Sequence, residues 1–184
     1  MRTKPIVLLC LAVLLASCSM NTMTSSSSLP GTTIVYSDAD IAGIVRTANQ
    51  GGVDQGQVAT SRANSDEVRA FARMMVSDHS KALTQANDLF SRVNITPNDN
   101  SLTRTLASNS QQTVNSLNTY SGAEFDNKYI QSQIDIHQWL LNSLDSTLIP
   151  SAHDRQLRDF LQTQRSAVAM HLDRAKQIQQ TLGS

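Results

Sequence analysis

The sequence predicts an all-α protein, a bundle of four long helices with a shorter helix in the middle of the chain. From Ser37 onward, apolar residues recur at spacings of three and four, which is the period of an amphipathic helix. No stretch shows the strict alternation, bounded by Gly, Pro or Asn turns, that is typical of strands. Residues 37–184 are also long enough to bury a single hydrophobic core, so we expect one domain there.

The chain opens with a secretory leader. A short basic head, residues 1–4, precedes an apolar run over residues 6–16 that is too short to span a bilayer as a helix. The tetrad Leu-Ala-Ser-Cys at 15–18 resembles the bacterial lipoprotein box, in which small residues precede a cysteine that receives the lipid anchor. We therefore expect a signal peptide at 1–17 and lipidation, with palmitate, at Cys18. An ordinary secretory signal cleaved near Ala16 is the alternative.

Residues 18–36 lack helical periodicity and are rich in Ser and Thr, so they predict a flexible tether. Such a segment reaches on the order of 25 Å from a membrane surface. Ser19, rather than Asp, follows the lipidated position, which favours the outer membrane, with the protein facing the periplasm. The membrane is thus the first expected partner.

Composition excludes several kinds of function. Cys10 leaves with the signal peptide and Cys18 is acylated, so no thiol remains for a disulfide, a nucleophile or a metal. Without Arg2 and Lys4, 13 basic side chains face 15 acidic ones, and no basic stripe is present to bind nucleic acid. We find no Gly-x-Ser-x-Gly elbow and no phosphate-binding glycine loop, so a non-enzymatic protein is favoured.

The first two helices have clear start signals. Ser37 precedes acidic residues at the start of a helix that we expect to run to about Thr60. Within it, Gly51 and Gly52 are poor helix residues, which predicts close packing of another backbone. The second helix is expected to begin at Asn64, with a capping box, and to end before Pro97. Its inner stripe contains His79 among apolar residues.

The remaining helices follow in the second half of the chain. A shorter, polar segment is expected over 101–120, and Ser121-Gly122 ends it. The third long helix covers about 123–148 and carries His137 on its inner face. Pro150 separates it from the last helix, which Ser151 is expected to cap and which carries His171 at a core position.

The middle segment determines the topology that we expect. A helix of about 20 residues spans roughly 30 Å, enough to return the chain from one end of a bundle to the other. The second and third long helices then run parallel, which is the ferritin-like arrangement with one crossover connection.

Three short motifs carry a family resemblance. M-V-x-D-H at 75–79, F-D-x-x-Y-I at 125–130 and H-L-x-x-A at 171–175 resemble the ferritin-like family known as domain of unknown function 4142, which is common in bacterial envelope proteins. The resemblance covers residues 37–182 and implies the fold and the compartment, but no reaction. Members often carry an acidic residue near position 52. Gly52 stands there in this chain, which weakens a carboxylate role for the first helix.

A di-iron carboxylate site is not expected. Such a site needs a Glu from each of two helices and a Glu-x-x-His pair from each of the other two. After the leader, the chain has only Glu67 and Glu124, and it has no Glu-x-x-His. Asp78 and Asp135 project away from the neighbouring histidines around their helices, so we do not expect them to complete a shared site.

The three core histidines, His79, His137 and His171, leave two interpretations open. Counting from the helix starts places His79 and His137 at one level, whereas His171 falls about 12 Å away along the axis. That offset favours hydrogen-bonded core histidines over ligands of one ion. We also expect His171 to face Tyr129, and Asp126 to lie near Arg174, as a structural polar core.

Two functions therefore remain. The favoured one is an envelope-anchored, non-enzymatic lipoprotein that binds an envelope protein partner or has a structural or stress role. The alternative is a periplasmic metal-binding protein that uses the buried histidines for Zn, Cu or Fe, with a redox link through Tyr129.

Overall fold

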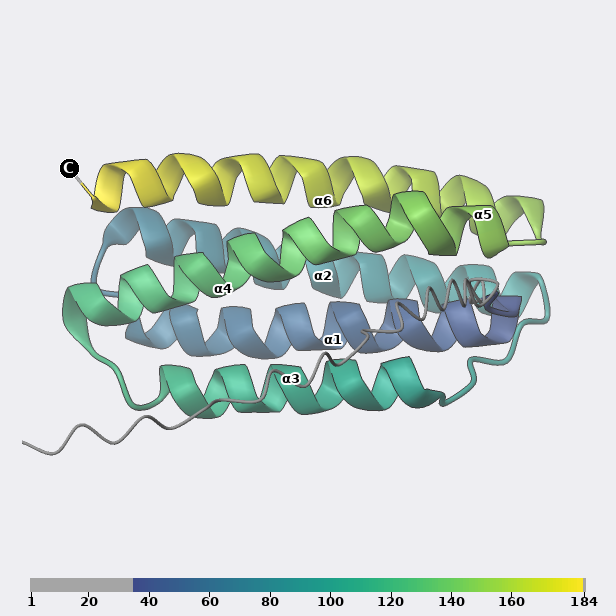
Figure 1. Cartoon of the computed structure of the whole chain (residues 1–184), viewed down its shortest axis with the longest axis horizontal. Coiled ribbons are helices and arrows are strands. Elements are labelled where there is room, and N and C mark those ends of the chain that lie inside the picture. Colours follow the sequence, from purple (N-terminus) through teal and green to yellow (C-terminus); the bar gives the residue numbers. More distant parts are fainter. Residues whose placement is uncertain (1–34, 184) are drawn as a thin grey trace, which may run out of the picture. The chain divides into compact units, whose positions relative to one another are not determined.

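The computed structural model describes residues 35–183, and all regular secondary structure in that range is helical (Figure 1). The all-α prediction is confirmed. The expected signal peptide, Cys18 and most of the expected tether lie outside the described residues. No helix in the described range is both long enough and apolar enough to cross a bilayer. The helices are α1 (Asp38–Arg62), α2 (Asp66–Arg92), α3 (Ser101–Leu117), α4 (Gly122–Ser143), α5 (Ile149–Ser151) and α6 (Arg155–Leu182).

The helix starts are set by side-chain caps. Ser37 and Asp40 form a reciprocal capping box at α1, with Ser37 Oγ accepting from the Asp40 amide at 3.1 Å. Ser65, rather than the expected Asn64, caps α2. Asp154, rather than the expected Ser151, caps α6 by accepting from the Leu157 amide at 2.9 Å. The last helix therefore begins later in the sequence than predicted.

The helices pack side by side in a fixed order. α1 packs along both α2 and α3, α4 packs along α6, and α2 contacts α6. α1 and α2 run in opposite directions, and α3 returns the chain along the outer side of α1 (Figure 1). As a result α2 and α4 run in the same direction, and α6 runs opposite to both.

The helix that begins as α4 does not stop before Pro150. It widens into a π-helical turn, η1 (Leu144–Leu148), and continues through α5 to Ser151. A proline ring clashes with the carbonyl four residues earlier in a regular α-helix. The wider turn directly before Pro150 gives its ring room, which accounts for the continuation. The reversal of the chain therefore lies at 152–154, after the proline.

Two aspartates join the helix pairs to one another. Asp126, in the first turns of α4, accepts hydrogen bonds from the amides of Asn64 and Ser65 at 2.9 and 2.7 Å. Asp38, at the start of α1, accepts in the same way from the amides of His153 and Asp154 at 2.8 and 2.9 Å. Each carboxylate thus holds the amides at the beginning of a helix in the opposite pair, α2 or α6. These contacts fix the positions of α2 and α6 along the axis.

The apolar core forms two separate clusters. One gathers residues from the start of α1, the end of α2, the end of α4 with η1, and the start of α6. The other gathers the opposite ends of the same four helices. Buried polar side chains lie between the two clusters at the middle of the helices. We call this set the polar layer: Asn49, Gln55, His79, Gln133, His137 and His171.

Candidate functional site

The polar layer brings together three histidines from three helices, which we call the histidine cluster. His79 comes from α2, His137 from α4 and His171 from α6, and each side chain is at least nine-tenths buried. Their ring centroids lie 5.4–5.9 Å apart. The prediction that His79 and His137 share a level is correct, and the 12 Å offset predicted for His171 is wrong.

The error has a physical cause in the connection before α6. The prediction placed the turn at Pro150, but the helix continues past the proline and the chain reverses near His153. Counted from there, His137 and His171 differ by two residues, or about 3 Å at the rise of an α-helix. The π-helical turn and the late cap together bring His171 to the level of the other two rings.

His79 is held by α1. Its Nδ1 lies 2.9 Å from Asn49 Oδ1. The Asn49 amide nitrogen itself donates to the Val45 carbonyl at 2.8 Å, which leaves Oδ1 as an acceptor toward the ring. Nδ1 therefore carries the proton, and Nε2 has a bare lone pair. The ring lies against Gly52, where a Cβ would be 2.5 Å from His79 Cδ2, so this glycine admits a side chain rather than the expected backbone.

The other two rings are held by acceptors as well. His137 Nδ1 lies 2.7 Å from the Gln133 backbone carbonyl, which can only accept, so Nδ1 is protonated. His171 Nε2 lies 3.0 Å from Asp78 Oδ2, so here Nε2 carries the proton. Asp78 projects away from its neighbour His79, as expected. It contacts His171 on α6 instead, which was not expected. Asp135 stays exposed.

One nitrogen of each ring remains unpaired, and the three rings lie close together. His79 Nε2, His137 Nε2 and His171 Nδ1 are buried and have no hydrogen-bond partner among the described residues. Candidate ligand atoms of the three rings all lie within 4.8 Å of one another. Buried polar atoms normally have a partner, and unpaired ones cost free energy. Three unpaired acceptors directed to one region therefore need a common explanation.

Burial keeps at least two of the rings neutral. It lowers the pKa of His79 to about 3, with added repulsion from His137 and His171. Burial also lowers the pKa of His137 to about 4, although its bond to the Gln133 carbonyl opposes the shift. Neutral imidazole is the form that binds metal ions.

The arrangement matches the needs of a transition-metal ion. Nitrogens bound to one Zn²⁺ at about 2.0–2.1 Å lie about 3.4 Å apart, so the rings have to approach one another by at most about 1.4 Å. Each ring is already oriented through its second nitrogen by an amide, a carbonyl or a carboxylate, which is the usual outer shell of a histidine ligand. The group of possible ligands consists of three imidazoles, and the prediction against a di-iron carboxylate site stays a prediction.

The sequence analysis did not identify Asn49 as part of the site, and it gave Gly52 and Asp78 other roles. A signal for Asn49 was present. Each long helix carries a polar residue in its apolar stripe near its middle, and Asn49 on α1 is the counterpart of the three histidines. Comparing the four stripes level by level identifies the polar layer. The role of Asp78 could not be found in this way, because its side chain reaches a different helix from that of its neighbour His79.

A chain of amides continues the polar layer toward α3. Gln133 donates to Gln55 Oε1 at 2.9 Å, and Gln55 donates to Ser110 Oγ at 3.2 Å. A small cavity of about 60 Å³ borders this chain and is also lined by His79 and His137. It is large enough for one or two water molecules.

The residues expected to form a structural polar core lie elsewhere. Tyr129 is fully buried between Phe71 and Phe125, with ring centroids 6.2 and 6.4 Å away, and burial raises the pKa of its phenol. Its hydroxyl has no hydrogen-bond partner among the described residues. The rings that contact His171 are His79 and His137, so the expected pairing of His171 with Tyr129 is not formed.

Asp126 and Arg174 do not form the expected pair either. Asp126 is buried and accepts from the backbone before α2, as described above. Arg174 is exposed on α6 and donates to Glu67 Oε1 on α2 at 3.0 Å. The two side chains project from different faces of the packed helices, so Arg174 belongs to the surface rather than to the core.

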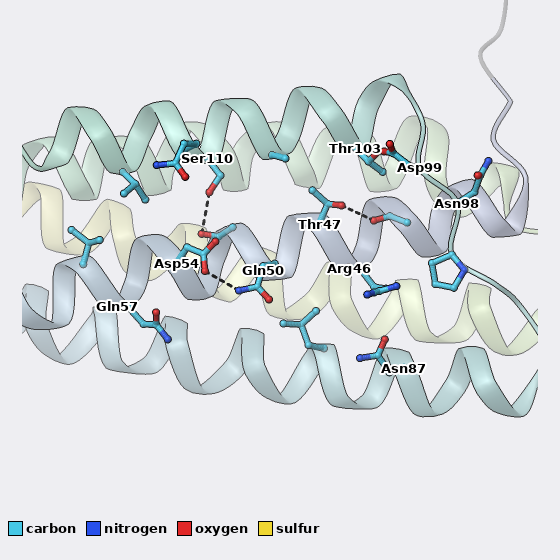
Figure 2. A pocket seen from close by; sticks show the side chains of 18 residues that line it. Arg46, Thr47, Gln50, Asp54, Gln57, Asn87, Asn98, Asp99, Thr103 and Ser110 are labelled. Carbon is cyan, nitrogen blue, oxygen red and sulfur yellow. Dashed lines mark hydrogen bonds between the residues drawn. The ribbon is translucent and has the colours of Figure 1, made fainter.

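A wider groove of about 750 Å³ lies between α1, α2 and α3, away from the histidine cluster (Figure 2). Several of its polar groups bond to one another or to the backbone. Gln50 donates to Asp54 at 2.8 Å, and Thr47 donates to the Gly43 carbonyl at 3.0 Å. The groove is open and polar, and it contains no cluster of buried, unpaired polar atoms such as the histidine cluster has among the described residues.

Comparison with known proteins gives one match. Residues 23–178 match the sequence profile of a family described as a domain of unknown function (DUF4142). No curated protein and no solved structure matches the chain.

Proposed function

The chain belongs to the DUF4142 family, as its motifs predicted, and since that family description assigns no activity, we propose a function from the site itself. The protein binds one divalent transition-metal ion through His79 Nε2, His137 Nε2 and His171 Nδ1. A single observation carries this proposal. Three buried histidines from three helices each have one nitrogen without a hydrogen-bond partner among the described residues, and candidate ligand atoms of the three lie within 4.8 Å of one another.

The alternative, purely structural histidines, explains less of the geometry. A histidine that locks the register of a bundle uses its polar atoms in hydrogen bonds, and each ring here does so with only one nitrogen. The other nitrogens face one another as acceptors, an arrangement that costs stability unless a cation or a donor lies between them. A bound metal ion supplies that missing partner for all three rings.

The chemistry of the ligands narrows the choice of metal. Imidazole nitrogens bind Zn, Cu and Fe, whereas Ca²⁺ and Mg²⁺ take oxygen ligands. Three histidines with an outer shell of hydrogen bonds are the protein ligands of zinc sites that keep a fourth position open. We therefore take Zn²⁺ as the first ion to test, followed by Cu²⁺ and Fe²⁺.

The setting of this site is also proposed. The parallel α2 and α4, with α3 between them in sequence, support a ferritin-like four-helix bundle with a crossover helix. The leader and the Leu-Ala-Ser-Cys tetrad support a lipoprotein anchored through Cys18 to the outer membrane and facing the periplasm. The function is then metal binding at the envelope, with no reaction assigned.

The test is metal stoichiometry. The full chain, purified in detergent and stripped with chelator, is incubated with Zn²⁺, and its metal content is measured after dialysis. We expect one ion per chain, and loss of that ion in His79→Gln and in His137→Gln. His153→Gln is the matched control, because His153 is exposed and lies outside the cluster. The proposal would be refuted if the wild-type chain bound none of Zn²⁺, Cu²⁺ and Fe²⁺. It would also be refuted if the two cluster variants bound as much metal as the wild-type chain.

A further inference from the structure

A second cavity opens directly onto the histidine cluster. It has a volume of about 290 Å³ and is lined by His79 and His171. Its walls come from α2 and α6, and α1, α4 and η1 close its far side. Three small residues, Ala48, Ala82 and Ala167, leave the space open between the helices.

The lining of this cavity is divided by polarity. Its interior is aliphatic: Ile44, Val45, Leu140, Leu144, Leu148, Leu161 and Val168. Lys81, Gln85, Thr163 and Gln164, which are exposed or partly exposed on α2 and α6, form a polar rim. Asn49 and Asp78 line the cavity together with the two histidines. Asn49 Oδ1 is bonded to the His79 ring, and Asp78 Oδ2 is bonded to the His171 ring. His79 and His171, each of which has one buried nitrogen without a hydrogen-bond partner among the described residues, thus line a mostly apolar space.

We propose that this cavity binds a small, uncharged molecule with one donor atom and an apolar body, and that the donor atom takes the open coordination position of the metal. The inference rests on the proposed metal site. Three protein ligands leave a fourth position on a tetrahedral ion. The cavity borders two of the three proposed ligands, His79 and His171, whereas the small cavity that borders His79 and His137 holds little more than water.

Size and charge define the class of ligand. An apolar cavity of about 150 Å³ binds benzene, so 290 Å³ admits a body of one aromatic ring with a substituent or of a similar aliphatic chain. A charged ligand would lose its hydration among seven aliphatic side chains, at a large cost in free energy. The ligand is therefore neutral, and its donor is a nitrogen, oxygen or sulfur atom at one end.

The experiment uses the full chain loaded with Co²⁺, whose visible absorption reports a change of ligands at the ion. 4-Phenylimidazole is the probe, because it carries a neutral nitrogen donor on an apolar ring. Imidazole-4-acetate, which has the same donor with a charge, is the comparison. We expect a saturable spectral change with 4-phenylimidazole, and at least tenfold weaker binding of the charged compound.

Two alanines on α6 give a matched pair of variants. Ala167 lines the cavity, whereas Ala169, two residues further along and equally half-buried, does not. Ala167→Phe should abolish the response to 4-phenylimidazole while Co²⁺ stays bound, and Ala169→Phe should leave the response unchanged. If Ala167→Phe does not fold, Gln164→Trp at the rim of the same cavity replaces it.

The outcomes separate the two proposals. Bound Co²⁺ with no response to the probe, or with a response that survives in Ala167→Phe, overturns the inference and leaves the metal site standing. A chain that binds no Co²⁺, Zn²⁺ or Cu²⁺ overturns the metal site, and this inference falls with it.

Discussion

Gly52 decides where the imidazole of His79 can lie. A Cβ at this position would lie 2.5 Å from Cδ2 and 2.7 Å from Nε2 of the ring, well inside van der Waals contact. The ring cannot move away without breaking its bond to Asn49 or leaving the histidine cluster. Glycine is less favourable than alanine in a helix by about 1 kcal/mol. Its presence at the middle of α1 is explained by the space that the His79 ring needs.

We predict that Gly52→Ala lowers metal affinity by about 10- to 100-fold, the range seen when the outer shell of a ligand is disturbed. The helix should form at least as well, because alanine is the better helix residue. Gly51→Ala is the matched control, since its Cβ would meet only the side chain of Ser110, at 2.9 Å. Metal titration of both variants measures the effect, and equal affinity of the two would show that the ring position does not control binding.

The buried histidines also make stability depend on pH in the metal-free protein. The pKa values of His79 and His137 are lowered to about 3 and about 4, whereas an unfolded histidine titrates near 6.5. Between these values the unfolded chain binds more protons than the native one, so the free energy of unfolding falls as pH decreases from about 6.5 toward 4. Each group contributes at most about 1.4 kcal/mol per pH unit, and the two together about 2.7.

Urea unfolding at pH 7, 6 and 5 in the presence of chelator tests this prediction. The wild-type free energy should fall steadily over this range. His137→Gln should lose about half of the slope, because one of the two groups no longer takes up a proton on unfolding. A free energy that stays constant from pH 7 to pH 5 would show that the rings are not held neutral by burial.

At the scale of elements, helix existence was predictable and helix register was not. Apolar periodicity and the cap at Ser37 predicted α1 closely, and the motif positions placed all three histidines on inner faces. The position of His171 along the bundle axis depends on how many residues lie in the connection between α4 and α6. Pro150 is normally a stop signal, and nothing local in the sequence announced the π-helical turn that lets the helix pass it. A three-residue error in the position of this turn changes the offset between His137 and His171 by six residues, or about 9 Å at the rise of an α-helix.

The contacts of Asp126 with the start of α2 and of Asp38 with the start of α6 set the positions of these helices along the bundle axis. Asp126 is almost fully buried and accepts two amide hydrogen bonds, and bonds to a charged acceptor contribute about 1.5–3 kcal/mol each. An asparagine would present an NH₂ group to one of these amides. We predict that Asp126→Asn lowers the free energy of unfolding by about 3 kcal/mol.

Asp38→Asn makes the matched comparison, because Asp38 does the same for the start of α6 but is only partly buried. Its effect in urea unfolding should be clearly smaller, since water can replace the lost bonds. A loss for Asp126→Asn no larger than that for Asp38→Asn would mean that burial of the carboxylate adds nothing to the contact.

At the scale of the whole molecule, the polar layer divides one continuous helical domain into two apolar clusters. The clusters at the two ends stabilise the helices, and the layer between them can therefore hold three imidazoles with unpaired nitrogens. Sequence periodicity predicted the apolar stripes that build both clusters. It could not predict which polar atoms remain unpaired, because that depends on partners from other helices, such as Asn49 for His79 and Asp78 for His171.

The whole chain is expected to be attached to a membrane, and this expectation depends on one residue, Cys18. If Cys18 carries the lipid, Cys18→Ser removes the anchor, and the described helices, which do not contain this residue, should stay intact. We predict that the wild-type chain, expressed in a bacterium with an outer membrane, fractionates with membranes and incorporates labelled palmitate. The Cys18→Ser variant should do neither. Cys10→Ser is the control, because Cys10 lies in the expected signal peptide and should leave both properties unchanged. Palmitate in the Cys18→Ser chain, or none in the wild type, would refute lipidation at this position, whereas the metal site depends on residues 49–171 alone.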